Sequence, residues 1–239
     1  MPLIAYPPGM ARARFVSRHK RFTVRLEDAA GHDILAHTNN TGTMLGLVRP
    51  GAGALLSPAA NPKRKLPWTL EALDFHGTLV GVNTMTPNRM LAAAFAAGRL
   101  PELAGYARLT PEARSGDSRL DARLDGRKDG PADQPPCWVE CKNVTLVEDG
   151  GVALFPDAPT ERGRKHLVEL MRLARTGARV ALFFLVQRAD AACFAPAGVV
   201  DPEYERLFSA ALDAGVEAWP YLAEVTESGI DLGARLPLA

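Results

Sequence analysis

The chain has 239 residues, of which 47% are hydrophobic, and it carries 28 basic against 27 acidic side chains. This apolar content is ample for one large domain or two ordinary ones, and it argues against intrinsic disorder. The nearly balanced charge excludes the overall electrostatic attraction of a strongly basic nucleic-acid binder.

Residues 14–82 are divided into short apolar runs, such as 22–26, 34–36 and 79–82, separated by clusters of Gly, Pro and Asn. This pattern is typical of all-β structure. About five short strands in this length suit a small barrel, and the five-stranded oligonucleotide-binding barrel is one such fold. Residues 1–83 carry 10 basic against 5 acidic side chains, whereas the remainder carries 18 against 22. The division fits one domain that binds phosphates and another that gathers carboxylates around cations.

The pattern changes at Thr86, which can cap a helix that begins at Pro87 and ends at Gly98. We therefore expect a barrel over residues 1–82 and a second domain over residues 83–239. The second domain mingles strands with capped helices, which predicts an α/β fold with a mixed sheet. The predicted helices are 160–177 and 201–215, the predicted strands are 119–125, 137–146, 180–186 and about 216–221, and 126–136 is a predicted loop.

Asp121, Glu140 and Lys142 are the candidate catalytic residues. Alternation along the strand 119–125 places Leu120, Ala122 and Leu124 on one face and Asp121 on the other. Glu140 and Lys142, two residues apart, share a face of the following strand. If the two strands pair, the three charged side chains converge.

This grouping suits hydrolysis of a phosphodiester, which requires a hard cation with oxygen ligands. Asp121 and Glu140 would supply carboxylates to Mg2+ or Mn2+, and the carbonyl of Cys141 is a further candidate ligand. Lys142 would orient the attacking water and stabilise the transition state. A cross-strand ion pair is the alternative interpretation. The apolar residues that flank Glu140 and Lys142 favour function, because an idle carboxylate would be costly there.

Two basic segments are candidate nucleic-acid contacts. Arg162, Arg164 and Lys165 lie in the first turns of a predicted helix, where the macrodipole favours an anion such as phosphate. An exposed helix balanced by Glu161 and Glu169 is the alternative.

In the predicted barrel, Lys63, Arg64 and Lys65 precede Trp68, a combination that can follow a phosphate backbone and stack a base. Arg21, next to Phe22, repeats it. A solvated loop is the alternative interpretation of the basic triplet.

The cysteines and the apolar runs indicate the compartment. Cys137 and Cys141, four residues apart in a strand, lie roughly 13 Å apart at about 3.3 Å per residue, too far for a disulfide. Further zinc ligands do not follow nearby, so buried, reduced thiols are expected. No run reaches the roughly 18 apolar residues of a membrane span, and the first ten residues lack a signal-peptide pattern. We expect a cytoplasmic protein without a membrane partner.

Several segments, in order along nearly the whole chain, resemble the sugar fermentation stimulation protein A family. They are 20–22, 40–44, 61–65 with Trp68, 82–84 with 88–89, 118–121, 139–146 and 155–167. The resemblance implies an oligonucleotide-binding-type barrel followed by a PD-(D/E)xK, restriction-endonuclease-like domain. It also implies non-specific DNA binding and a suspected regulatory link to sugar metabolism. The resemblance also implies that the upstream acid of the nuclease-like fold falls on Glu112. The spacing from Glu112 to Asp121 is loop-like, however, and Asp117 competes for this place.

Two functions therefore remain open. The first is a metal-dependent nuclease, and the second is a DNA-binding regulatory protein with a catalytically idle nuclease fold. A small-molecule enzyme of sugar metabolism ranks third, because neither a glycine-rich nucleotide loop nor a glycosidase-like carboxylate pair is identifiable. DNA is the expected partner, with RNA as an alternative, and the oligomeric state is open, a homodimer included.

Overall fold

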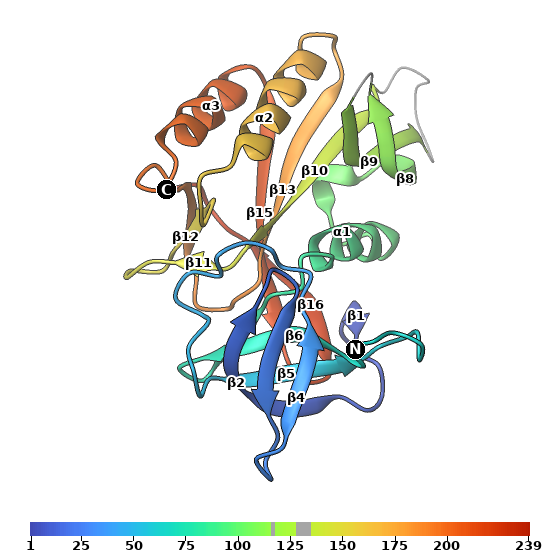
Figure 1. Ribbon diagram of the computed structural model, residues 1–239. Coiled ribbons are helices and arrows are strands. Elements are labelled where there is room, and N and C mark those ends of the chain that lie inside the picture. The colour runs from blue at the N-terminus through green and yellow to red at the C-terminus, as the bar shows by residue number, and fades with distance from the viewer. Residues whose placement is uncertain (116–117, 128–134) are drawn as a thin grey trace.

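The structure is a computed structural model that describes residues 1–115, 118–127 and 135–239. A β-barrel at the N-terminal end of the chain packs beneath an α/β domain (Figure 1). Among the described residues, no helix combines the length and the apolar character needed to cross a membrane.

The barrel is closed, as expected from the short strands of the sequence. Its strands are β2 (Ala11–His19), β3 (Thr23–Glu27), β4 (Asp33–His37), β5 (Gly53–Pro58) and β6 (Trp68–Phe75). They run antiparallel in the order β4-β3-β2-β5-β6, and a parallel pairing of β4 with β6 closes the ring. Alternation turns Ala13 and Phe15 of β2 into the core and leaves Arg12 and Arg14 exposed. This strand order and closure make the barrel an oligonucleotide-binding type.

The α/β domain is built on a mixed sheet in the order β1-β16-β15-β13-β10-β9-β8. Its strands are β1 (Ile4–Ala5), β8 (Tyr106–Ser115), β9 (Ser118–Arg127), β10 (Cys137–Val144), β13 (Arg179–Val186), β15 (Val216–Val225) and β16 (Gly229–Arg235). β10, β13 and β15 are parallel, whereas the other pairings are antiparallel. We expected all of residues 1–82 in the barrel, but β1 pairs with β16 in this sheet.

Helices cover both faces of the sheet. α1 (Thr86–Ala96) and the 3-10 helix η1 (Pro101–Leu103) pack on one face, and α2 (Glu161–Ala174) and α3 (Pro202–Asp213) pack on the other. A small sheet of β11 (Leu146–Val147), β12 (Val152–Phe155) and β14 (Cys193–Pro196) lies below α2 and α3. β13 lies between β10 and β15, and after Arg179 it is apolar throughout and buried on both faces.

The helix caps agree with the sequence at two of the predicted starts. Thr160 accepts the Gly163 N–H at 3.0 Å, and Asp201 accepts the Tyr204 N–H at 2.9 Å. The prediction for α1 was wrong, because Met85 is its N-cap and Thr86 already lies in the helix. The Thr86 hydroxyl is buried without a hydrogen-bond partner and caps no backbone N–H of α1. Most of the predicted loop 126–136 lies outside the described residues.

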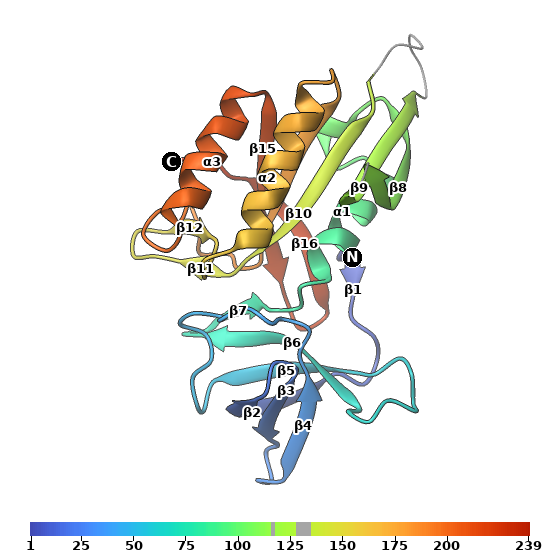
Figure 2. The ribbon, with the colours of Figure 1, turned by 45° about the horizontal axis from the view of Figure 1, so that its top comes forward.

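The two domains meet through a buried polar contact. β7 (Thr78–Gly81) extends β6 on the side of the barrel that faces the α/β domain (Figure 2). Gly81 donates its N–H to the Gln187 carbonyl at 2.8 Å. A Cβ at Gly81 would collide with the side-chain oxygen of Gln187 and lie 3.2 Å from its Cβ, so a larger residue would have to displace this side chain. Gln187 also donates to the Asn83 carbonyl, and Asn83 donates to the buried Glu71 of the barrel at 2.8 Å.

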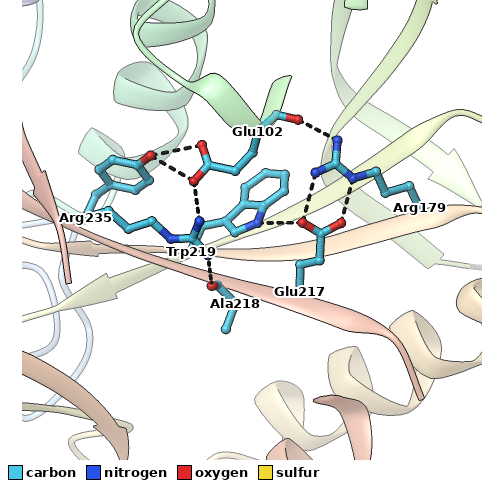
Figure 3. Close-up of polar contacts among 7 residues, drawn as sticks. Glu102, Arg179, Glu217, Ala218, Trp219 and Arg235 are labelled. Atoms are coloured by element: carbon cyan, nitrogen blue, oxygen red, sulfur yellow. Dashed lines mark hydrogen bonds and ion pairs between the residues drawn. The ribbon is translucent and has the colours of Figure 1, made fainter. Parts of the chain in front are cut away.

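A charged cluster joins η1 to the sheet and serves a structural purpose (Figure 3). The Glu102 carboxylate accepts from the Tyr221 hydroxyl and from Arg235 Nη1 at 2.7 Å. Its backbone carbonyl accepts from Arg179, which also forms a bidentate pair with Glu217. Because these carboxylates are fully engaged by cations and hydroxyls of the chain itself, the cluster offers no free charge to a ligand.

Candidate functional site

The site lies where β9 and β10 separate. Their register runs from Cys137↔Leu124 to Val139↔Ala122, and the next residues on the two strands are Glu140 and Asp121. Instead of a backbone pair, Asp121 places its carboxylate in the gap, where Oδ2 accepts the Cys141 N–H at 2.8 Å. The two candidate carboxylates are therefore neighbours across a split in the sheet.

Asn88 of α1 holds the other oxygen of this carboxylate. Its Nδ2 donates to Asp121 Oδ1 at 2.7 Å. With Cys141 on one side and Asn88 on the other, the carboxylate of Asp121 is fixed in orientation. Beyond its place in the family resemblance, Asn88 could not be predicted as a site residue, because a helix residue 33 positions from Asp121 carries no spacing signal.

Glu140 and Lys142 form a buried ion pair that includes a histidine. Lys142 Nζ donates to Glu140 Oε1 at 2.7 Å and lies 3.1 Å from His166 Nδ1 of α2. The same histidine nitrogen contacts Glu140 Oε1. The Glu140 side chain is only 4% exposed and that of Lys142 10%. His166 is the sole histidine beyond residue 83, and no spacing in the sequence marks it as a partner of Glu140.

The two carboxylates have opposite electrostatic settings. Burial raises the pKa of Asp121, and the neighbouring charge of Glu140 raises it further, while the bonds from Cys141 and Asn88 lower it only in part. Burial alone would raise the pKa of Glu140 too, but Lys142 and His166 outweigh it and bring that pKa down to about 2. The charge on Asp121 is therefore the less well compensated of the two.

The donors around this gap fit a hard cation. Two carboxylates that repel each other would both be stabilised by a divalent cation between them. The N–H and C=O of a strand residue point to the same edge, so the Cys141 carbonyl faces the gap beside Asp121. The Cys141 thiol lies in the core, where burial raises its pKa well above the ordinary value, so it remains protonated. In the part of the chain described, His, Cys, Asp and Glu side chains do not gather in threes around a candidate metal position. Main-chain oxygen and water would complete the coordination, as Mg2+ prefers.

Glu112 lies apart from this group. It belongs to β8, not to a loop as its spacing suggested, and its neighbours Pro111 and Ala113 pair with Ala122 and Leu120 of β9. Its backbone adopts a positive φ of 50°, and its carboxylate contacts exposed Arg119 at 3.4 Å. The side chain is 63% exposed, so in this conformation it faces solvent rather than the gap. The competing Asp117 lies outside the described residues.

The basic start of α2 divides into two parts. Arg164 pairs with the buried carboxylate of Asp201 at 2.9 Å. For this one cation the partner anion is therefore a side chain of the protein and not the phosphate predicted from the sequence. Arg162 and Lys165 are exposed on the same turns. Because His166 of this helix reaches Glu140, these two cations lie on the helix that contacts the site.

The basic loops of the barrel also divide. Lys63, Lys65 and Arg21 are exposed. Arg64 turns inward, where it donates to the Leu66 and Trp68 carbonyls at 2.6 and 2.7 Å. Trp68 packs against the barrel core and is half-buried, which leaves less of its ring for a base than the sequence suggested.

A separate hollow of about 620 Å3 is lined by the barrel and by the turn between β15 and β16, and none of the candidate carboxylates lines it. Arg12 and Arg14 line it together with Glu27, Asp28, Asp74 and Glu227. Arg12 forms an ion pair with Glu227 across it. Its two arginines face four carboxylates, so the hollow has a net negative charge that disfavours an anion such as a phosphate. The residues predicted from the sequence to carry the chemistry lie instead at the split sheet.

Fold and site together define a two-domain protein in which an oligonucleotide-binding-type barrel precedes a mixed α/β domain. Residues 16–82 match the family model described as the SfsA N-terminal OB domain, and residues 85–229 match that of the sugar fermentation stimulation protein RE domain. The chain belongs to the sugar fermentation stimulation protein A family.

Relatives and one solved structure agree over the whole chain. A sugar fermentation stimulation protein homolog of Maridesulfovibrio salexigens is 58% identical over 238 residues, covering 100% of this chain and 98% of that protein. The homolog of Syntrophobacter fumaroxidans is 56% identical, covering 98% of this chain and 87% of that protein. The structure of Pyrococcus furiosus SfsA in complex with Ca2+ matches with a TM-score of 0.89 at 27% identity, covering 100% of this chain and 99% of that one. The predicted fold class and family are thus confirmed.

Proposed function

We propose that the protein hydrolyses phosphodiester bonds of nucleic acid, DNA or RNA, with a divalent cation, Mg2+ or Mn2+, between Asp121 and Glu140. The observation that carries the proposal is the placement of these two carboxylates across the split between β9 and β10, with Lys142 beside them. The Pyrococcus furiosus relative was solved in complex with Ca2+, a hard cation of the class that such oxygen ligands prefer.

The residues would divide the work as follows. Asp121, Glu140 and the Cys141 carbonyl would hold the cation, which lowers the pKa of a bound water and neutralises charge on the reacting phosphate. Asn88 would keep the Asp121 carboxylate in position, and His166 would do the same for Glu140. Lys142 presents N–H donors that can orient the attacking water or bind a phosphate oxygen.

The basic surfaces would supply substrate binding. Arg21, Lys63 and Lys65 on the barrel and Arg162 and Lys165 on α2 are exposed cations without a structural task. Lysine and arginine contacts to phosphates are independent of base sequence and weaken as salt concentration rises. The expected binding is therefore non-specific in sequence. Glu112 would join the site only if its strand segment changed conformation.

A DNA-binding protein without turnover is the second candidate. It is favoured by the contacts of Glu140, because Lys142 and His166 already compensate its charge in the absence of a cation. The suspected link to sugar metabolism fits such a regulatory role and rests on the family name alone.

Cleavage of labelled single-stranded DNA, double-stranded DNA and single-stranded RNA separates the two candidates. The first predicts cleavage of at least one substrate with Mg2+ or Mn2+ and none with chelator. Asp121→Ala and Lys142→Ala should each slow it by a factor of about 100 or more, whereas Asp149→Ala, on an exposed turn, should not. Binding without any cleavage, or cleavage that survives both substitutions, would contradict hydrolysis at this site.

A further inference from the structure

Two aromatic rings lie together on the outside of the barrel. Phe22, just before β3, is 51% exposed, and His37 ends β4. Their rings are stacked, with planes 11° apart and centroids 6.1 Å apart. The backbone fixes this arrangement, because Thr23 pairs with His37 and the Thr38 N–H donates to the Phe22 carbonyl at 3.0 Å. We call Phe22 and His37 the aromatic pair.

The basic loop 61–67 is anchored beside this pair. Arg64 Nη2 donates to Thr69 Oγ1 at 2.9 Å, and Thr69 is the residue of β6 that pairs with His37. Arg64 thus holds the loop against the end of β4, while Lys63 and Lys65 remain exposed at its surface. Burial and the Arg64 charge lower the pKa of His37, so its ring is neutral near neutral pH.

Exposed cations lie on both loops that adjoin the aromatic pair. Lys20 and Arg21 precede Phe22 on the loop between β2 and β3, and both are exposed. Lys63 and Lys65 lie on the loop between β5 and β6, which Arg64 anchors at Thr69. An exposed hydrophobic ring flanked by unpaired cations fits a ligand that alternates a flat apolar face with negative charge. A nucleotide strand has this composition.

We propose that the aromatic pair is a stacking subsite for an unpaired base of single-stranded nucleic acid, with the four flanking cations on its phosphates. In a duplex the faces of the bases already stack on one another, so the subsite discriminates in favour of single strands. This inference rests on the proposed function in one respect, which is that the strand held here is also the one hydrolysed at Asp121 and Glu140.

A series of hydrogen bonds links the aromatic pair to the segment that leads into α2. Arg18, two residues before Lys20, donates to the Gly42 and Asn40 carbonyls, both at 2.7 Å. The adjoining Thr43 hydroxyl and Met44 N–H donate to Asp157 at 2.9 and 3.0 Å.

Asp157 lies three residues before Thr160, the N-cap of α2, and α2 carries His166 to Glu140. The loop that contains Gly42 and Thr43 lies between the barrel and the α/β domain (Figure 1). A strand stacked on the aromatic pair would therefore lie on a barrel whose loop is hydrogen-bonded to the segment before α2, the helix that contacts Glu140.

Binding to probes with and without bases tests the subsite directly. Fluorescence anisotropy, in chelator so that no cleavage occurs, would compare a labelled oligothymidine, an abasic strand of equal length, the matching RNA and a duplex. Phe22→Ala should weaken binding of the oligothymidine by about 5- to 150-fold, the range of one lost base stack. Binding of the abasic strand should not change, because its phosphates meet the same cations.

Two further variants guard against a trivial result. Phe22→Tyr keeps a flat ring and should bind within about twofold of the wild type. Val199→Ala removes an apolar side chain that is 92% exposed on the α/β domain, and it should change nothing. Equal losses for the abasic strand and the oligothymidine, an unchanged oligothymidine affinity in Phe22→Ala, or a wild-type preference for the duplex would each overturn the inference. A protein that cleaves no substrate but passes these tests would refute the proposed hydrolysis and leave the stacking subsite standing.

Discussion

Replacing Lys142 with methionine tests the electrostatics of the site in the fold itself. The Glu140 carboxylate is almost fully buried, and burial would raise its pKa if Lys142 and His166 were not there. Instead its pKa falls from an ordinary 4.5 to about 2. A lowering of this size corresponds to about 3 kcal/mol of stability for the ionised form. Because the folded-state pKa is the lower one, this stability is present above pH 4.5 and is lost as pH falls towards 2.

Lys142→Met removes the charge that is the largest single favourable influence on Glu140, and it keeps most of the length of the side chain. Urea unfolding in chelator should therefore show a loss of about 3 kcal/mol near neutral pH, shrinking as the pH falls below 4.5. The double variant Glu140→Gln, Lys142→Met should recover much of the loss, since it leaves no unpaired buried charge. Equal stability of Lys142→Met and wild type near neutral pH, or a loss that does not change with pH, would refute this reasoning.

Three further predictions concern the surroundings of the site. Asp121→Asn should increase the free energy of unfolding near neutral pH in chelator, because burial and Glu140 raise the pKa of the carboxylate that is removed. The same variant should not cleave nucleic acid when Mg2+ or Mn2+ is present. A lower free energy of unfolding in urea would contradict the first expectation. Asn88→Ala should weaken Ca2+ binding by about 10-fold or more in calorimetry, because Asn88 orients the Asp121 carboxylate. Arg89→Ala, at the exposed neighbouring position, should leave Ca2+ binding unchanged. Equal Ca2+ affinities of Asn88→Ala and wild type would count against a positioning role for Asn88. Asp157→Ala removes the acceptor of Thr43 and Met44 and should speed proteolysis within residues 39–44, an effect absent if the loop is held by other contacts.

The sequence predicted those elements whose ends carry side-chain chemistry. Thr160 and Asp201 cap their helices because their side-chain oxygens meet backbone N–H groups of the first turn. β13 could be recognised as a strand covered on both faces because its core is an unbroken apolar run. β8 was not predicted as a strand, because it is mostly exposed, contains Pro111 and has a positive φ at Glu112. Such a strand shows no alternation, and only its pairing with β9 reveals it.

The residues of the candidate site could be predicted from their spacing within each strand, but their contacts with other strands and helices could not. Spacing placed Asp121, Glu140 and Lys142 correctly on two neighbouring strands. Spacing could not show that these strands separate at Asp121, nor that Asn88 and His166 arrive from helices on opposite faces of the sheet. The same limit applies to Arg64, whose inward bonds are to carbonyls and a hydroxyl that no sequence pattern marks.

The central claim is that Asp121 and Glu140 hold one divalent cation in the split between β9 and β10. A crystal of the protein grown with Ca2+ tests it most directly. The account predicts a density peak about 2.3–2.6 Å from an oxygen of each carboxylate, with the Cys141 carbonyl or water completing the coordination. A well-ordered crystal in which Lys142 and His166 still contact the Glu140 carboxylate, with Ca2+ bound elsewhere or not at all, would contradict it.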